Sequence, residues 1–252
     1  MKCKITDEKL NPFMSFGKMP SANGFLDKED FDKEFFYEME VGFSKKISLL
    51  QLNEFSHPEK VHNERYPFYT SSSLNMKRHF QSFAHWMRDK YLGSGSKLVE
   101  VGSNDGTLLE NFKDKNIEAI GFEPSKSIAE LANKKNIKTL NKFFNSENIL
   151  DIKNFHSSVD VICSANVIAH IPDLKDVINS VDKLLSSKGL LIFEEPYLGS
   201  MFSKVSYDQI YDEHIFMFSV SSIKKIFDLF DFELIDILPQ ETHGGSMRYV
   251  IG

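Results

Sequence analysis

Apolar residues are arranged differently in the two parts of the chain that meet near residue 92. After that point, short apolar runs alternate with segments in which apolar residues recur every three or four positions. The runs predict buried strands, and the segments between them predict amphipathic helices. The predicted strands are residues 97–101, 118–122, 137–140, 159–165 and 189–194, and the predicted helices are residues 106–113, 125–135 and 174–186. This alternation predicts a parallel sheet that binds ligands at the carboxyl ends of its strands.

The end of the chain departs from this alternation. A helix is predicted over residues 219–230, and strands are predicted over 232–238 and 246–251. The connection between these last two strands is too short for a crossover, so they must pair antiparallel. A mostly parallel seven-stranded sheet with an antiparallel last strand resembles the Rossmann-like core of the class I methyltransferases. We therefore expect an α/β protein of this fold.

The first part of the chain lacks a sustained period. Residues 1–70 contain scattered aromatic side chains and turn residues, which predict a small irregular N-terminal lobe. Residues 71–92 carry apolar side chains at helical spacing and predict a connecting helix. A Gly-Ser-Gly-Ser segment then marks the start of the main domain, which we expect over residues 93–252.

Composition and charge exclude several classes of protein. The chain has 252 residues, of which 41% are apolar and 26% are charged, as is typical of a soluble globular protein. Its 30 basic and 36 acidic side chains give a net charge of −6, which argues against nucleic-acid binding. The sequence has neither an apolar run long enough to insert into a membrane nor the apolar core of a signal peptide, so we expect a cytoplasmic protein. Cys3 and Cys163 are too few for a disulfide framework.

The turn after the strand at residues 97–101 carries candidate cofactor chemistry. Gly102 and Gly106 allow a ligand to approach the backbone there. The third glycine of the dinucleotide-binding motif and a basic residue for a pyrophosphate are both missing, so a small cofactor without phosphates fits better. Glu100 and Asp105 lie beside this turn. Glu123 ends the next strand, where a carboxylate can bind both hydroxyls of a ribose.

This combination resembles a site for S-adenosylmethionine, whose product is S-adenosylhomocysteine. The resemblance implies that Glu100 and Gly102 border the methionine part of the cofactor and that Asp105 lines the same pocket. The other implied contacts are Glu123 at the ribose, Asn166 at the methyl end and Phe144 beside the adenine, and Pro124 is also expected to bind the cofactor.

Further motifs occur in an order that resembles the deoxysugar C-methyltransferases. They are Val-Gly-x-Asn-Asp-Gly at 101–106, Gly-Phe-Glu-Pro-Ser at 121–125, Asn-Val-Ile-Ala-His at 166–170, Glu-Pro-Tyr-Leu at 195–198, Ile-Tyr-Asp-Glu-His at 210–214 and His-Gly-Gly-Ser-x-Arg at 243–248. The N-terminal half also matches, for example at Pro-Ser-Ala-Asn (20–23) and Tyr-Pro-Phe (66–68), so the resemblance covers nearly the whole chain.

The resemblance implies a set of residues around the acceptor. Family members methylate a nucleotide-linked keto sugar, and the matching residues around the reacting carbon are His170, Tyr211, Glu213 and His214. A histidine has a suitable ordinary pKa for a general base, and His214 is the first choice, with His170 as the alternative. The expected substrate-binding residues are Tyr66, Tyr69, Tyr197, His243 and Arg248.

The sequence departs from this family in two respects. The family binds zinc in its N-terminal lobe through two Cys-x-x-Cys pairs, whereas this chain keeps Cys3 and has Ser44 and Ile47 at the second pair. Isoleucine has no donor atom, so we expect no metal. The family also continues into a further domain that contributes to sugar-nucleotide binding, so we expect a shortened member, for which the family's usual acceptor does not follow from the resemblance.

The leading hypothesis is a methyltransferase that acts on a sugar, or on a nucleotide-linked or phosphorylated intermediate of a bacterial surface polysaccharide such as a capsule. Transfer to oxygen receives at least as much weight as transfer to carbon, because a hydroxyl group needs chiefly one base. The alternatives are C3-methylation of a nucleotide-linked 4-keto-6-deoxysugar and a non-catalytic subunit that binds the cofactor. The sequence leaves the oligomeric state open.

Overall fold

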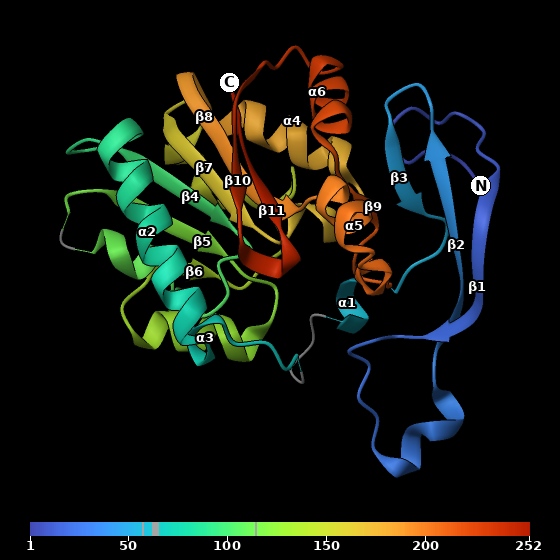
Figure 1. Cartoon of the computed structure of the whole chain (residues 1–252). Helices are drawn as coiled ribbons and strands as arrows, with labels where there is room; N and C mark the ends of the chain where they lie inside the picture. The colour runs from blue at the N-terminus through green and yellow to red at the C-terminus, as the bar shows by residue number, and fades with distance from the viewer. Residues whose placement is uncertain (57, 62–65, 114) are drawn as a thin grey trace. The chain divides into compact units, whose positions relative to one another are not determined.

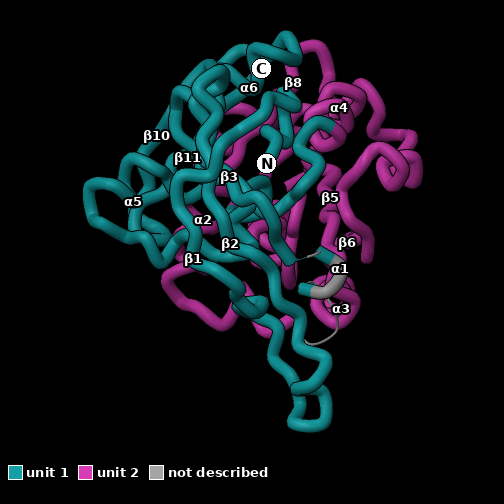
Figure 2. The backbone as a smooth tube through the Cα atoms, turned by 90° about the vertical axis from the view of Figure 1, so that its right-hand side faces the viewer, with its two compact units in different colours: residues 1–65, 166–175, 194–251 teal, residues 66–165, 176–193, 252 magenta. Residues whose placement is uncertain are grey.

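The computed structural model describes residues 1–56, 58–61, 66–113 and 115–252. The chain forms two compact units that interleave along the sequence (Figure 2). Unit 1 contains residues 1–65, 166–175 and 194–251, and unit 2 contains residues 66–165, 176–193 and 252. The domain boundaries expected from the sequence stay predictions.

The main sheet has seven strands in the order β10-β11-β8-β7-β4-β5-β6 (Figure 1). Strand β4 pairs in parallel with β5 and β7, whereas β10 pairs antiparallel with β11. The predicted fold class is thus confirmed. The strands are β4 (Lys97–Val101), β5 (Glu118–Phe122), β6 (Thr139–Leu140), β7 (Val159–Ala165), β8 (Leu185–Pro196), β10 (Leu234–Gln240) and β11 (Ser246–Ile251).

The central strands form because their apolar side chains are buried on both faces. Leu98 and Val99 are adjacent in β4, point to opposite faces and are both fully buried. Helix α2 begins after Ser73, whose side chain accepts a hydrogen bond from the Met76 N–H at 3.3 Å. The helices between residues 70 and 184, apart from η5 (Ile168–His170), are α2 (Leu74–Tyr91), α3 (Lys126–Lys134) and α4 (Leu174–Leu184), with 3-10 helices η2 (Thr70–Ser72), η3 (Leu109–Phe112) and η4 (Asn148–Phe155).

The helix predicted over residues 106–113 is wrong in its length and type. The structure has a turn there, followed only by the short helix η3. Gly102, Asn104 and Gly106 all have positive φ angles, so regular helical geometry cannot begin until the chain has passed Gly106. The residues that make this turn a candidate ligand site therefore prevent a helix from beginning at Gly106.

The N-terminal part is more regular than its pattern predicts. Strands β1 (Pro12–Pro20), β2 (Phe36–Ser44), β3 (Leu49–Leu52) and β9 (Phe216–Met217) form an antiparallel four-stranded sheet in that order. Most side chains of β1 are exposed, so the strand lacks the alternation that would have revealed it. The buried cluster of this sheet includes Tyr37, Met39, Val41, Leu52 and Met217.

Short helices complete unit 1. Ser219 caps α6 reciprocally with Ser222, because each side chain accepts a hydrogen bond from the other residue's backbone N–H. The α-helices are α1 (Pro58–Val61), α5 (Leu198–Lys204) and α6 (Val220–Asp228), and the 3-10 helices are η1 (Lys28–Lys33), η5 (Ile168–His170), η6 (Tyr207–Gln209) and η7 (Thr242–Gly244). In the part of the chain that the structure describes, no helix is both long and apolar enough to cross a membrane.

Candidate functional site

Residues 102–106 of unit 2, which we call the glycine turn, follow β4 directly. The N–H groups of Gly102 and Ser103 both donate to the Phe122 carbonyl, at 2.9 and 3.0 Å. Gly106 has a φ of +78°, and a Cβ there would lie 2.6 Å from Cδ1 of Ile137. Both the backbone angle and the packing therefore require glycine at this position.

Two of the three predicted carboxylates beside this turn have raised pKa values. Glu100 is buried, and among the described residues its Oε2 atom has no hydrogen-bond partner. Burial raises the pKa of Glu100 well above its ordinary value, and the charges of Glu123 and Asp105 raise it further. Glu123 accepts hydrogen bonds from the N–H groups of Asn104 (3.0 Å) and Ser125 (2.8 Å), but burial still raises its pKa.

Asp105 differs from these two residues because it has several donors. Burial alone would raise its pKa, but hydrogen bonds from Ser71 and Thr107 and the charge of Lys135 together lower it. The Ser71 N–H lies 3.2 Å and the Thr107 hydroxyl 2.6 Å from the carboxylate of Asp105. The turn therefore combines Asp105, whose pKa is lowered, with Glu100 and Glu123, whose pKa values burial raises.

The segment that carries Tyr66 and Tyr69 is fixed to this turn. Asn104 donates from Nδ2 to the Phe68 carbonyl at 3.1 Å and accepts the Thr70 N–H at 2.9 Å. Tyr66 and Tyr69 are both half-buried. The two tyrosines expected to bind substrate thus belong to a segment that is hydrogen-bonded to Asn104, beside the expected cofactor residues.

The other residues expected at the cofactor lie near the end of β5 or in unit 1. The Pro124 carbonyl accepts a hydrogen bond from Asn141 Nδ2 at 2.7 Å. Phe144 is buried and packs edge to face on Phe122, with ring centroids 5.2 Å apart. Asn166 belongs to unit 1, where it has a φ of +58° and a buried Oδ1 atom without a partner among the described residues.

His214 has a defined tautomer. Its Nδ1 atom lies 2.7 Å from the Gln209 carbonyl oxygen, which can only accept a hydrogen bond. The proton therefore resides on Nδ1, and Nε2 carries the lone pair. Burial lowers the pKa of His214 to about 4, an effect that the nearby His243 reinforces and the bond to Gln209 opposes. The imidazole is thus neutral at ordinary pH, and the ordinary histidine pKa expected from the sequence does not apply.

Three further predicted residues surround His214 in unit 1. The His170 and Tyr211 rings have centroids 5.2 and 4.3 Å from that of His214. The Nδ1 atom of His170 lies 3.9 Å from Oε2 of Glu213. Burial raises the pKa of the Tyr211 phenol, as do the charges of Glu213 and Asp212. The four residues expected around the reacting carbon therefore form one cluster, which we call the histidine cluster.

Two residues near the N-terminus, to which we assigned no role from the sequence, bond to Glu213 of this cluster and to its neighbour Asp212. Asn23 donates a hydrogen bond from Nδ2 to Oε1 of Glu213, and the Ala22 N–H donates to Oδ1 of Asp212 at 3.1 Å. Burial also raises the pKa of Glu213, against the effect of Asn23. The signal for Asn23 was its place in the Pro-Ser-Ala-Asn motif, but a motif alone does not reveal its partner.

The remaining predicted residues occupy different surroundings in unit 1. The Tyr197 N–H donates to the Gly245 carbonyl at 3.0 Å. His243 is exposed and has a φ of +50°. Arg248, expected to bind substrate, is buried and forms an ion pair with Glu194, in which Nε lies 2.7 Å from Oε1. Arg248 is thus already paired with a carboxylate of its own chain.

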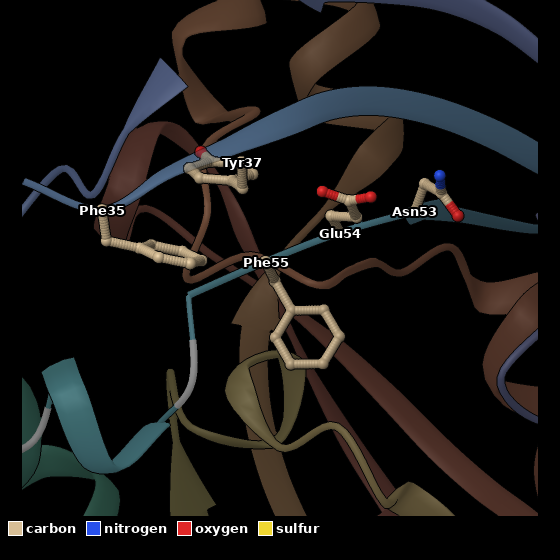
Figure 3. A pocket seen from close by; sticks show the side chains of 5 residues that line it. All are labelled: Phe35, Tyr37, Asn53, Glu54 and Phe55. Carbon is tan, nitrogen blue, oxygen red and sulfur yellow. The ribbon is translucent and has the colours of Figure 1, made fainter. Parts of the chain in front are cut away.

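A small pocket also lies in unit 1, on the N-terminal sheet (Figure 3). Phe35, Tyr37, Asn53, Glu54 and Phe55 line its volume of about 260 Å³. The Phe35 and Tyr37 rings stack with centroids 6.4 Å apart. None of the lining residues was expected at the site.

The positions that correspond to the family's zinc ligands lack a complete donor set. Cys3 is buried, and its Sγ atom accepts the Thr6 N–H at 3.5 Å. The Ser44 hydroxyl donates to Oε2 of Glu8 at 2.7 Å, and Ile47 is buried hydrocarbon. Among the described residues, no three His, Cys, Asp or Glu side chains are grouped so that they could hold a metal ion. The residues present therefore do not fit a four-ligand zinc site.

Two family models match the chain. Residues 74–237, more than half of the chain, match a model described as "Methyltransferase domain". Residues 3–62 match one described as "Putative zinc binding domain". The second match agrees with the motifs of the N-terminal part, although the metal ligands are replaced as described above.

One curated relative is the C-methyltransferase NovU of Streptomyces niveus, which is 28% identical over 236 residues. The match covers 93% of this chain and 56% of that protein, so the chain spans about half the length of the relative. Among solved structures, magnesium protoporphyrin IX methyltransferase from Synechocystis PCC 6803, with bound SAH, has a TM-score of 0.53 and 14% identity over 69% of this chain and 82% of its own.

A methyltransferase of Leishmania major that depends on S-adenosylmethionine has a TM-score of 0.54 and 14% identity, over 73% of this chain and 77% of its own. At such identities the likeness concerns the fold alone. The fold is nevertheless the one expected from the sequence, and the family model covers both the glycine turn and the histidine cluster. The chain therefore belongs to the S-adenosylmethionine-dependent class I methyltransferases.

Proposed function

We propose that this protein transfers a methyl group from S-adenosylmethionine to a carbon next to the carbonyl group of a sugar-type acceptor. The observation that carries the proposal is the histidine cluster. It combines a neutral imidazole, whose Nε2 has a lone pair, with a phenol that burial keeps protonated. A base and a hydrogen-bond donor are the two groups needed to form an enolate.

The glycine turn supports a role in holding the cofactor. Glu100 and Gly102 would contact the methionine part, and Glu123 would accept hydrogen bonds from the ribose hydroxyls. The unpartnered Oε2 of Glu100 is a buried acceptor that the ammonium group of the cofactor would satisfy. When bound, S-adenosylmethionine supplies a sulfonium methyl group to a nucleophile. The turn thus offers carboxyl oxygens to the ammonium group and to the ribose hydroxyls of this cofactor.

The chain's own residues would carry out the proton transfer. His214 Nε2 takes the proton from the acceptor carbon, and the Tyr211 hydroxyl donates a hydrogen bond to the carbonyl oxygen as negative charge develops there. The carbon then forms a bond to the methyl group while the bond from methyl to sulfur breaks. The products are the methylated acceptor, S-adenosylhomocysteine and a proton that leaves His214 for water. Glu213, held by Asn23, keeps His170 beside this base.

Two observations favour carbon over oxygen as the methylated atom. A hydroxyl acceptor needs chiefly a base, whereas the half-buried Tyr211 adds a donor that suits an enolate oxygen. The relative NovU is also named a C-methyltransferase. The acceptor class that we propose is a keto sugar, free, phosphorylated or nucleotide-linked, from the synthesis of a bacterial surface polysaccharide. Methylation of a sugar hydroxyl is the second candidate, because His214 alone would serve it.

Cofactor binding is the first test. Titration calorimetry with S-adenosylmethionine and S-adenosylhomocysteine should show binding to the wild type, and Glu123→Ala should weaken it at least tenfold. Glu118 is exposed at the start of the same strand, so Glu118→Ala is the matched control and should bind normally. A folded wild type that binds neither compound would refute the proposal.

The acceptor test measures release of S-adenosylhomocysteine with keto sugars and their reduced, hydroxyl-bearing analogues. His214→Ala should lower the rate about 10²- to 10⁴-fold, whereas His85→Ala, an exposed position on α2, should not change it. For carbon methylation, the acceptor's α-proton exchanges with deuterium from the solvent and the product has a carbon-bound methyl group. An ether methyl group in the product would establish the second candidate instead.

A further inference from the structure

We propose that Glu195 is a positioning residue, whose carboxyl group holds the turn that carries His170 and so keeps that imidazole beside Glu213 and His214. The catalytic part of this inference rests on the proposed function. Glu195 was not among the expected site residues, although it belongs to the Glu-Pro-Tyr-Leu motif.

The two adjacent glutamates of strand β8, Glu194 and Glu195, have different hydrogen-bond partners. Consecutive side chains of a strand point to opposite faces. Glu194 pairs with Arg248, whereas Oε1 of Glu195 accepts the N–H groups of Val167 at 3.0 Å and Ala169 at 3.3 Å. Both glutamates are fully buried. Neither glutamate is therefore exposed to solvent. The hydrogen bonds of Glu195 go to the backbone of residues 167–169.

That backbone needs an external acceptor. The N–H groups at the start of a helix have no partner within it, and no side chain caps η5 from its N-cap position, Val167. Glu195 supplies the missing acceptor from a distant part of the sequence. The His170 N–H then closes the turn onto the Val167 carbonyl at 2.9 Å. The carboxyl group thus fixes the backbone from which the His170 side chain projects.

The His170 ring lies among the proposed catalytic groups. Its Nδ1 is 3.9 Å from Oε2 of Glu213, and its centroid is 5.2 Å from that of His214. A turn freed from Glu195 would let this ring move relative to both partners. Because catalysis is sensitive to displacements of about 1 Å, such a movement of the His170 ring should lower kcat.

The second oxygen of Glu195 explains which substitution should be tolerated. Oε2 is buried and has no partner among the described residues. Burial raises the pKa of Glu195 to about 8 against the opposing hydrogen bonds of the turn, and the charge of Glu194 adds to this effect. The ionisable groups coupled to it are Glu194 on β8, Tyr211 in the histidine cluster and Tyr249 on β11. A neutral glutamine has the same shape and keeps the carbonyl oxygen that the turn requires.

The experiment compares Glu195→Gln with Glu195→Ala. Side-chain ¹⁵N resonances of His170, assigned by their loss in His170→Gln, report the ring's environment without any acceptor. We expect Glu195→Ala to shift these resonances and to lower kcat about 10- to 100-fold, with the KM for S-adenosylmethionine unchanged. Glu195→Gln should keep the wild-type resonances and a kcat within about threefold.

Asp160→Ala is the matched control, because Asp160 also accepts a backbone N–H, that of Lys97 at 2.8 Å, but in unit 2. It should lower stability without shifting His170. Unchanged His170 resonances in folded Glu195→Ala would overturn the inference, even if the variant is less stable. The resonances decide the question if no acceptor is turned over, so failure of the proposed function remains distinguishable.

Discussion

Buried carboxyl groups are the residues in which this protein departs most from ordinary side-chain behaviour. Glu194 is compensated by Arg248, and Asp105 by several hydrogen-bond donors and Lys135. Glu100 and Glu195 each retain an oxygen without a partner among the described residues, and burial raises the pKa of both. The buried carboxyl groups of Glu100, Asp105 and Glu195 thus differ in the direction or cause of their pKa shifts, because their hydrogen-bond donors and neighbouring charges differ.

Glu195 should make the stability of the protein depend on pH. Its pKa is about 8 in the folded chain and 4.5 as the ordinary value, so the folded state holds one more proton between these limits. The stabilisation is therefore complete below about pH 4.5 and declines as the pH rises towards 8, by up to about 1.4 kcal/mol per pH unit. Relative to the wild type, Glu195→Gln should become progressively more stable across this window.

Urea unfolding between pH 5 and 9 measures this difference in the free energy of unfolding. Glu233 is exposed, so Glu233→Gln should give a curve parallel to that of the wild type. A constant difference between Glu195→Gln and the wild type over the whole range would mean that Glu195 is ionised in the folded protein.

At the scale of elements, three glycines on either side of β4 show how one residue type serves conformation at one position and both conformation and packing at another. Gly93 has open space around it and no positive φ, Gly95 has a φ of +86° in open space, and Gly106 has both a positive φ and a close neighbour. Alanine should be tolerated at Gly93 within about 0.5 kcal/mol. It should cost about 1–2 kcal/mol at Gly95, from the left-handed backbone alone.

Alanine at Gly106 should cost about 2–4 kcal/mol, because overpacking against Ile137 adds to the backbone term. Thermal or urea unfolding of the three variants gives the order of these costs. Equal losses at Gly95 and Gly106 would show that Ile137 moves aside easily and that packing does not fix the turn.

At the scale of the whole molecule, the N-terminal sheet should be stable without zinc. The positions of the second metal-binding pair hold Ser44, which is hydrogen-bonded to Glu8, and the hydrocarbon of Ile47. We expect the purified protein to contain less than about 0.1 equivalent of zinc and to keep its Tm within about 1 °C after treatment with a chelator.

Elemental analysis and thermal unfolding check this expectation on the same preparation. Bound zinc near one equivalent, together with a large fall in Tm on chelation, would contradict it. Addition of zinc to the chelated protein is the control, because a true structural site would then recover its Tm.

The sequence by itself determined the parts of the protein that depend on local pattern. Strands β4, β5, β7 and β11 have the predicted bounds, since continuous apolar runs specify buried strands. The sequence also predicted that Glu100, Asp105 and Glu123 lie near one another at the glycine turn, because the ends of parallel strands meet at one edge of a sheet. The prediction of a helix from Gly106 was wrong at its start, because a residue with a positive φ cannot begin a right-handed helix whatever the apolar spacing.

Only the tertiary structure decided how distant residues act on one another. Asn23 and Glu213 are 190 positions apart, yet they share a hydrogen bond, and Gln209 fixes the tautomer of His214. Arg248 meets Glu194 across 54 positions. Periodicity records which side chains are buried but not which partner each one finds. The pKa of a buried group depends on that partner, so the chemistry of the histidine cluster could be read only from the folded chain.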